Sequence, residues 1–176
     1  RNSSLGGQLR YAFIPPGREE IQNIITYLER QISKLKVHIK MGKEVDFQTL
    51  KEEQPDTIIV ATGGNPLMLN LPGIKGENVC SASAVWDGKG SLGKDVVIIG
   101  GGTVGCEVAL HVAKQGAMRP DVACFLLKHK VLDARDVVEY TTRGNRNVTI
   151  LEMKRKIGGG FGISTRWVIL NEIKDA

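Results

Sequence analysis

Asp95-Val-Val-Ile-Ile-Gly-Gly-Gly-Thr-Val-Gly105 is the stretch that decides the fold, because four consecutive aliphatic residues run directly into a glycine-rich turn. The β-branched run Val96 to Ile99 makes Asp95 to Ile99 typical of a strand buried in a parallel sheet. The residues after it match the spacing Gly-x-Gly-x-x-Gly. Val104 to Gln115, closed by Gly116, predicts a helix. We therefore expect a strand, a tight turn and a helix in direct succession.

Each glycine of this turn has a separate physical task. Gly100 permits the sharp change of direction between strand and helix, Gly102 leaves room for a pyrophosphate beside the backbone, and Gly105 lets helix and strand pack closely. The helix N-terminus offers unpaired N–H groups and a partial positive charge to the phosphates. An ordinary turn is the alternative, but the strand, helix and downstream acid favour a nicotinamide dinucleotide site. Its predicted binding residues are Gly100, Gly101, Gly102, Thr103, Val104 and Gly105.

The next strand predicts which dinucleotide is preferred. Val148 to Leu151 is a short aliphatic run that ends on Glu152. A carboxylate there accepts hydrogen bonds from the adenosine ribose and repels a 2′-phosphate, which favours NAD over NADP. The basic trio Lys154-Arg155-Lys156 follows at once. Because an arginine near the ribose accommodates a 2′-phosphate, NADP stays open, with Arg155 as its predicted contact.

A long insertion separates the predicted helix from this strand. The segment 117–146 is far longer than the roughly 2–6 residues that usually connect such elements. Their pattern predicts two short helices, at Pro120 to His129 and at Asp133 to Thr142. We expect the insertion to pack on a neighbouring domain or to shape a cofactor entrance. A final helix is predicted from Ser164 to Lys174, with Ser164 as its N-cap.

The N-terminal part predicts a second α/β unit. Val37 to Met41 alternates in polarity and predicts a half-exposed strand that leaves His38 at the surface. Thr57 to Ala61 predicts a buried strand. Residues 64–92 are rich in Gly, Pro, Ser and Asn and predict a connector with little regular structure. Apolar residues at helical spacing predict an amphipathic helix before these strands: Ile21, Ile24, Ile25, Leu28, Ile32 and Leu35.

Composition excludes several classes of protein. Hydrophobic residues at 41% and charged residues at 24% are typical of a globular chain rather than a disordered one. The 21 glycines and only 5% aromatics suit a nucleotide-binding α/β protein better than a base-stacking surface. The net charge of +5 is scattered apart from residues 154–156, so we expect no nucleic-acid partner. No apolar run is long enough to span a membrane and no signal peptide is recognised, so we expect a cytoplasmic protein without a membrane partner.

The cysteines predict neither a disulfide framework nor a metal site. The chain has three, Cys80, Cys106 and Cys124, and no two of them form a Cys-x-x-Cys pair. Because the number of cysteines is odd and none lies in such a pair, we expect reduced thiols in an intracellular protein.

Four segments occur in a recognisable order: Gly6-Gly7-Gln8-Leu9, Ala61-Thr62-Gly63, Leu71-Pro72-Gly73-Ile74 and the glycine loop running into Gly105-Cys106-Glu107. This order resembles flavoproteins in which an NAD(P)-binding domain interrupts an FAD-binding domain. Two further segments are Leu5-Gly6-Gly7-Gln8-Leu9 with Pro15-Pro16, and Ser164-Thr165-Arg166-Trp167-Val168 after the Glu152 strand. With these, the closer resemblance is to the C-terminal half of the NADH:flavin oxidoreductases related to old yellow enzyme, which include 2,4-dienoyl-CoA reductase, 2-enoate reductase and trimethylamine dehydrogenase.

This resemblance implies an α/β protein with Rossmann-like parallel sheets in two dinucleotide-binding domains, both incomplete. Residues 1–70 would be a partial FAD domain, 71–92 the connector, and 93–176 a partial NAD(P) domain with the insertion at about 117–146. The implied FAD contacts are Gly7, Gln8, Thr62 and Gly63. Glu107 would help position the nicotinamide, although a solvated helix glutamate is an equal alternative.

The resemblance also implies a flavin-dependent oxidoreductase that passes hydride from NAD(P)H to FAD. The family's first glycine motif is absent and would precede Arg1, so we expect a fragment, with a barrel domain, FMN and an iron–sulfur cluster elsewhere in the parent enzyme. That enzyme would reduce an enoate or dienoyl substrate, and we expect no catalytic side chain and no metal ligand in this piece. An open sheet edge would allow self-association.

Two alternatives remain at this point. One is another two-domain flavoprotein, such as an NADH oxidase or a ferredoxin reductase. The other is a nucleotide-binding module without turnover. Thioredoxin reductases share the layout but carry Cys-x-x-Cys where this chain has Cys80-Ser81-Ala82-Ser83. A single cysteine cannot form the disulfide that passes electrons on.

Overall fold

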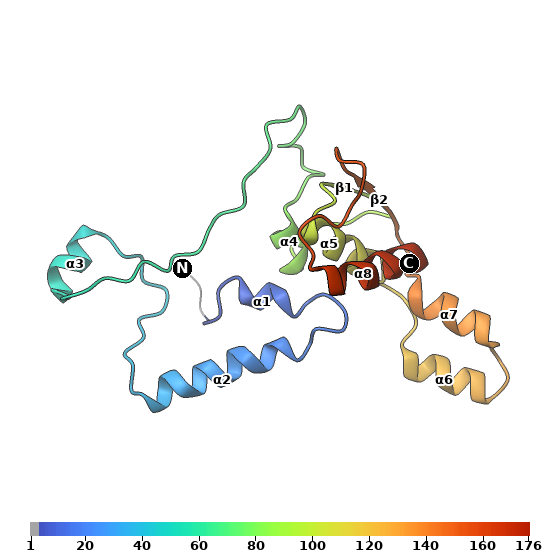
Figure 1. The fold of residues 1–176 in the computed structure, drawn as a ribbon, viewed down its shortest axis with the longest axis horizontal. Coiled ribbons are helices and arrows are strands. Elements are labelled where there is room, and N and C mark those ends of the chain that lie inside the picture. The colour runs from blue at the N-terminus through green and yellow to red at the C-terminus, as the bar shows by residue number, and fades with distance from the viewer. Residues whose placement is uncertain (1–3) are drawn as a thin grey trace. The chain divides into compact units, whose positions relative to one another are not determined.

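The computed structural model describes residues 4–176, which divide into two compact units at Ile74 (Figure 1). The second unit holds the decisive sequence. Its elements in chain order are α4 (Ala82–Trp86), β1 (Asp95–Ile99), α5 (Thr103–Ala113), α6 (Pro120–Lys128), α7 (Ala134–Thr142), β2 (Asn147–Leu151) and α8 (Ile163–Asp175).

The two strands of this unit form a small parallel sheet. β1 pairs with β2 from Asp95 opposite Asn147 to Ile99 opposite Leu151. The predicted strand–turn–helix and the strand ending before Glu152 are therefore confirmed. Parallel pairing brings the C-terminal ends of both strands to one edge, where the Gly100 N–H donates to the Leu151 carbonyl over 2.8 Å. The result is a mixed α/β fold with a Rossmann-like strand–helix–strand arrangement.

The core of the second unit lies mainly on α5. Cys106, Leu110 and Val112 have at most 1% of their surface exposed, and Val108 and Ala109 are also buried. α8 packs beside α5, where Lys114 Nζ and Glu172 Oε2 form an ion pair at 2.8 Å.

The opposite face of the sheet is bare among the described residues. Val97, Ile99 and Leu151 remain 53–59% exposed. The prediction that Asp95 to Ile99 is a buried strand is therefore wrong for this chain, because no described helix covers that side.

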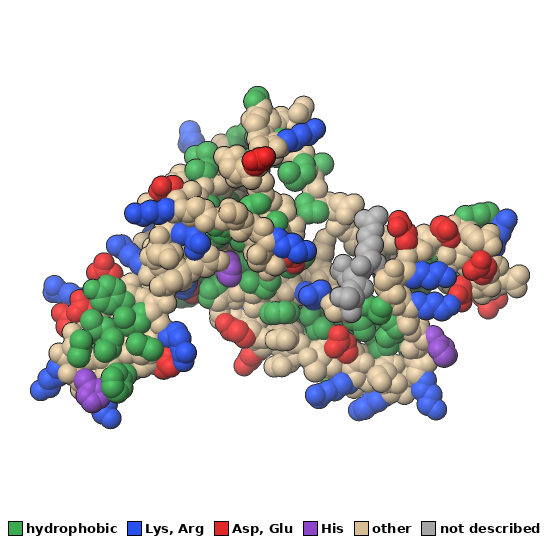
Figure 2. Space-filling model, turned by 180° about the vertical axis from the view of Figure 1, so that it is seen from behind, with side chains coloured by type: hydrophobic (Ala, Val, Ile, Leu, Met, Phe, Trp, Pro, Cys, Tyr) green, Lys and Arg blue, Asp and Glu red, His purple; other side chains and the backbone are tan. Residues whose placement is uncertain are grey.

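The insertion contains the two short helices that the sequence predicts, and the structure folds them into a hairpin. α6 begins at Pro120 and packs on α7. A capping box starts α7, in which Asp133 accepts the N–H of Asp136 and the Asp136 carboxylate accepts that of Asp133. Figure 2 shows hydrophobic side chains gathered over the hairpin between charged ones. The exposed apolar residues there are Val122, Phe125, Leu127, Val131, Val138 and Tyr140.

The first unit contains α1 (Leu9–Ala12), α2 (Ile21–Lys34) and α3 (Phe47–Glu53). The predicted amphipathic helix is α2, which buries Ile25 against Gly6. The predicted strands at Val37 to Met41 and Thr57 to Ala61 are wrong, since neither segment forms a strand and Met41 lies in a turn. A strand needs a neighbour for its backbone hydrogen bonds, and the described part of this unit offers none.

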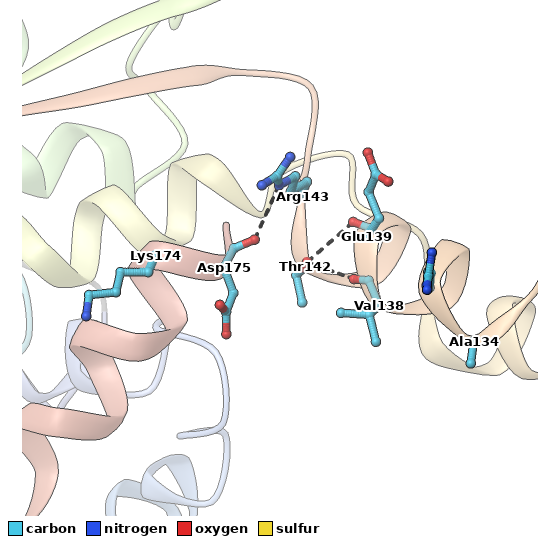
Figure 3. A pocket seen from close by; sticks show the side chains of 8 residues that line it. Ala134, Val138, Glu139, Thr142, Arg143, Lys174 and Asp175 are labelled. Carbon is cyan, nitrogen blue, oxygen red and sulfur yellow. Dashed lines mark hydrogen bonds between the residues drawn. The ribbon is translucent and has the colours of Figure 1, made fainter.

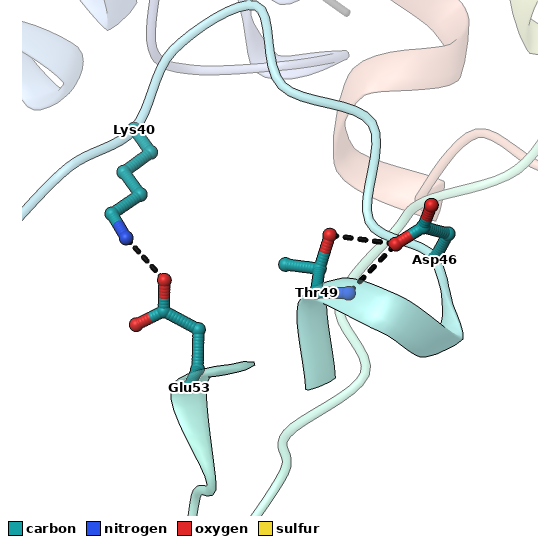
Figure 4. Close-up of polar contacts among 4 residues, drawn as sticks. All are labelled: Lys40, Asp46, Thr49 and Glu53. Carbon is teal, nitrogen blue, oxygen red and sulfur yellow. Dashed lines mark hydrogen bonds and ion pairs between the residues drawn. The ribbon is translucent and has the colours of Figure 1, made fainter. Parts of the chain in front are cut away.

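α3 is a helix that the sequence analysis did not predict, and a side-chain cap starts it. Asp46 caps it by accepting the Thr49 N–H at 2.8 Å and the Thr49 hydroxyl at 2.7 Å, and Lys40 pairs with Glu53 (Figure 4). These Thr49 hydrogen bonds lower the pKa of Asp46.

α8 begins one residue earlier than predicted. Its N-cap is Gly162, so Ser164 lies inside the first turn and the predicted Ser164 cap is wrong. The connector 64–92 likewise contains a short helix, α4, whose N-cap Ser81 accepts the Ala84 N–H. Among residues 4–176, no helix has both the length and the apolar character needed to cross a membrane.

The burial of α5 predicts a contrast between two valines of one helix. Val112→Ala should lower the free energy of unfolding by about 2 kcal/mol, because it leaves a cavity in the core. Val104→Ala should change it by less than about 0.5 kcal/mol, since Val104 is 55% exposed. Both changes alter helix propensity equally. Urea unfolding of the two variants measures the difference, and equal destabilisation would contradict a core centred on α5.

Candidate dinucleotide-binding site

The glycine loop has the geometry that its sequence requires. Gly100 adopts φ +104°, a left-handed conformation that favours glycine. A Cβ on Gly105 would lie 1.8 Å from the Gly100 carbonyl oxygen, so helix and turn touch there. A Cβ on Gly102 would meet nothing closer than the Gly159 oxygen at 3.7 Å, which leaves its outer side open. Gly100 and Gly105 therefore shape the loop, while Gly102 keeps a space beside it.

The N-terminus of α5 presents backbone donors that are unpaired within the helix. Its first internal hydrogen bond runs from Cys106 N to Gly102 O over 3.0 Å. Gly102 is the N-cap and has no side chain to accept an N–H. An α-helix leaves its first N–H groups without an acceptor inside the helix, and here the backbone of Gly159, which bridges to Gly102, lies beside them. Such donors at the positive end of a helix dipole bind anions, phosphate above all.

Glu152 reaches the glycine loop across 51 residues of sequence. Its Oε2 accepts the Gly101 N–H at 2.7 Å, and its Oε1 accepts the Lys154 N–H at 2.8 Å. These backbone hydrogen bonds, the one from Lys154 first, lower the pKa of the Glu152 carboxyl below its ordinary value. An ionised carboxylate therefore stands beside the loop, and each oxygen keeps a lone pair for a further donor.

The basic trio follows Glu152 at the same edge of the sheet. The side chains of Lys154, Arg155 and Lys156 are exposed. In the described part of the chain, no hydrogen bond or ion pair joins Arg155 to the glycine loop.

A second glycine segment, which the sequence reasoning missed, packs on the first. The Gly158 N–H donates to the Gly101 carbonyl at 2.6 Å, and Gly159 forms a parallel bridge with Gly102. The Thr103 hydroxyl donates to the Gly159 carbonyl at 3.5 Å. We call residues 153–160 the glycine strap. Its signal in the sequence is the Gly158-Gly159-Gly160 run, in which the first and third residues have positive φ.

Among the described residues, the thiols and acids form no cluster that could hold a metal. Cys106 is buried under the loop, donates to the Gly101 carbonyl at 3.4 Å, and has its thiol pKa raised by burial. Cys80 and Cys124 are exposed, and all three cysteines are free thiols. Residues 4–176 contain no cluster of three His, Cys, Asp or Glu able to hold a metal. Glu107 is half-buried on α5.

The residues implied for FAD lie in the first unit. Gln8 Nε2 donates to the Gly64 carbonyl at 2.8 Å, which brings the segment of Gly7 and Gln8 to that of Thr62 and Gly63. Gly7 and Gly63 both have positive φ, at +49° and +71°. The four residues are exposed.

A hollow of about 450 Å³ lies between α7 and α8 (Figure 3). Ala134, Val138 and Thr142 line one side, and Lys174 and Asp175 the other. Arg143 Nε donates to the Asp175 carbonyl at 3.4 Å and ties the two helices together. None of the glycine-loop residues lines this hollow, so it is separate from the dinucleotide site.

Comparison with known proteins fits the loop geometry. The model of the family "Pyridine nucleotide-disulphide oxidoreductase" matches residues 7–174. The chain belongs to this family. Its members are flavin-dependent oxidoreductases that bind FAD and a nicotinamide dinucleotide.

Individual relatives are much longer than this chain. It is 32% identical over 173 residues to a metal reductase of Desulforamulus reducens, covering 96% of this chain and 26% of the relative. It is 39% identical over 122 residues to an NADH oxidase of Thermoanaerobacter brockii, covering 66% and 19%. A solved 2-naphthoyl-CoA reductase complex matches at TM-score 0.75 and 25% identity, covering 98% of this chain and 22% of that one. The chain thus spans between about a fifth and a quarter of the length of these proteins.

The glycine geometry predicts that one of two alanine substitutions destabilises the protein and that the other does not. Gly105→Ala should destabilise the second unit by about 3 kcal/mol, because its Cβ would overlap the Gly100 carbonyl. Gly102→Ala should leave the unfolding free energy nearly unchanged, since its Cβ has room. Chemical denaturation of both variants provides the test, and a stable Gly105→Ala protein would refute the close helix–turn contact.

The Glu152 hydrogen bonds predict a titration at the loop. Because the folded-state pKa of Glu152 is lowered, its stabilisation is present above the ordinary value of 4.5 and is lost as pH falls through the lower folded value. The Gly101 amide shift in an NMR titration should follow this carboxyl with a midpoint below 4.5. Glu152→Gln should abolish the titration. A midpoint at or above 4.5 in the unmodified protein would contradict the hydrogen bonds.

Proposed function

We propose that this chain binds NADH on the glycine loop and presents it to FAD as part of a longer flavin-dependent reductase. The observation that supports this best is the start of α5 at Gly102, where no side chain caps the helix and its first internal hydrogen bond begins only at Cys106. An ionised carboxylate, Glu152, stands at the same loop. Donors for a pyrophosphate and an acceptor for a ribose are the two groups that a dinucleotide site needs.

Each end of the site has a proposed role. The loop from Gly100 to Gly105 holds the pyrophosphate through its backbone and the helix dipole. Glu152 accepts the adenosine ribose hydroxyls and disfavours a 2′-phosphate, so NADH is the preferred nucleotide. Arg155 becomes the contact if NADPH is used. Glu107 lies on the first turns of α5 and is proposed to face the nicotinamide side.

FAD is proposed to contact Gly7, Gln8, Thr62 and Gly63, whose segments the Gln8–Gly64 hydrogen bond draws together. When bound, FAD supplies the acceptor for the hydride of NADH. The residues of this chain bind and orient, and none serves as an acid, a base or a nucleophile.

The parent enzyme is proposed to carry a barrel with FMN and an iron–sulfur cluster and to reduce an unsaturated substrate of enoate or dienoyl type. The match to a 2-naphthoyl-CoA reductase supports a conjugated acyl substrate. The resemblance to the old yellow enzyme-related group supports the same reaction class.

A second candidate is an NADH oxidase, which the Thermoanaerobacter brockii relative favours. Both candidates use the same dinucleotide site, and they differ in the final electron acceptor. Anaerobic NADH consumption that depends on an added enoate supports the reductase. Consumption that depends on oxygen supports the oxidase.

The proposed site is tested by titrating the intact, flavin-loaded protein with NADH and with NADPH. Gly102→Val should weaken NADH binding by about a hundredfold or more, because the new side chain occupies the pyrophosphate space. Gly93→Val is the matched control, since a Cβ at Gly93 meets nothing within 4 Å, and it should leave affinity unchanged.

The outcomes of this titration are distinct. NADH binding that Gly102→Val removes, with bleaching of the flavin by NADH, supports the proposal. Preference for NADPH moves the ribose contact from Glu152 to Arg155. Failure of the intact protein to bind either nucleotide would overturn the proposed function.

A further inference from the structure

Arg166 connects α8 to the glycine strap. Its Nη2 donates to the Ile157 carbonyl at 2.9 Å. Its Nε is buried and has no hydrogen-bond partner among the described residues. Two guanidinium nitrogens of the half-buried Arg166 are therefore accounted for: Nη2 contacts the strap and Nε is shielded from solvent.

The strap in turn holds the glycine loop. The residue after Ile157 is Gly158, whose N–H donates to the Gly101 carbonyl at 2.6 Å. A backbone bridge between Gly159 and Gly102 continues the contact. One arginine in α8 thus reaches the glycine loop through a single backbone segment.

The fit between strap and loop is close. A Cβ on Gly101 would lie 2.6 Å from Ile157 Cγ2, and one on Gly158 would lie 3.4 Å from Arg166 Nε. Movement of the strap therefore changes the surroundings of Gly101 and Gly102 directly.

The strap also adjoins the ribose end of the proposed site. It begins just after Glu152, whose Oε1 accepts the Lys154 N–H at 2.8 Å. It carries the exposed trio Lys154, Arg155 and Lys156. Anchoring the strap therefore fixes the loop, the carboxylate and the basic side chains together.

We propose that Arg166 is a positioning residue, which holds the strap on the glycine loop and so sets dinucleotide affinity without touching the dinucleotide. This inference rests on the proposed function for its ligand. The anchoring itself, by contrast, is measurable without any nucleotide.

The experiment compares Arg166→Met and Arg166→Lys with Arg143→Met in the intact, flavin-loaded protein. Arg143 is the matched control, because its Nε also donates to a backbone carbonyl. That carbonyl belongs to Asp175, which is part of neither the glycine loop nor the strap. One readout is the Kd for NADH. The other is the rate of trypsin cleavage after Lys154, Arg155 and Lys156, relative to cleavage after Lys128 and Lys130 in the hairpin.

We expect Arg166→Met to weaken NADH binding about tenfold, because losing the hydrogen bond that holds the strap lowers the fraction of protein in the binding conformation by about that factor. It should speed cleavage in the strap but not in the hairpin, and saturating NADH should slow that cleavage again. Arg166→Lys should restore part of both, because an ammonium can still donate to Ile157. Arg143→Met should change neither, and FAD content should stay constant throughout.

Unchanged affinity and unchanged strap cleavage in Arg166→Met would overturn the proposal, as would a general loss of stability with NADH affinity intact. Where Arg166→Met does not fold, Arg166→Lys decides: intermediate strap cleavage supports anchoring, and wild-type cleavage overturns it. Loss of NADH binding by the unmodified protein would instead remove the proposed function, while the nucleotide-free cleavage rates still judge the strap.

Discussion

The contact between Gly105 and the Gly100 carbonyl is the constraint on which the rest of the second unit depends. Only a residue without a Cβ allows α5 to start directly over the end of β1, since a Cβ would sit 1.8 Å from that oxygen. The close start places the N-terminus of α5 at Gly102. Cys106, Leu110 and Val112 of the same helix are buried. The proposed phosphate site and the core of this unit therefore depend on the same helix start.

The negative charge of Glu152 is stabilised by hydrogen bonds from backbone N–H groups. Glu152 is held ionised by two N–H groups, one from the loop and one from the strap. The carboxylate that we propose as the ribose acceptor also holds Gly101, so the proposed recognition and the loop conformation are linked. Arg166 acts at a distance on the same backbone through Ile157. A site built in this way depends on the placement of main chain more than on the identity of surface side chains.

Much of the second unit follows from the sequence, whereas much of the first does not. The strand from Asp95, the glycine loop and the inserted helices are set by local patterns, and each has its partner within the chain. The strands expected at Val37 to Met41 and Thr57 to Ala61 need ladder partners that the described residues do not supply. The contact of Gly158 with Gly101 could not be predicted, because a hydrogen bond between backbone groups does not depend on the side-chain pattern. The predicted roles of Arg155, Gln8 and Thr62 remain predictions.

The neck of the helical hairpin has a consequence for how the sheet forms. Gly144 N donates to the Ala113 carbonyl and Met118 N to the Tyr140 carbonyl, so the ends of the insertion are tied together beside α5. Once the hairpin has folded, the chain that must be closed to pair β2 with β1 is shorter than its residue number suggests. Since the entropy of loop closure grows only with the logarithm of length, the insertion costs strand pairing little. The length of the hairpin can therefore vary while the register between β1 and β2 stays the same.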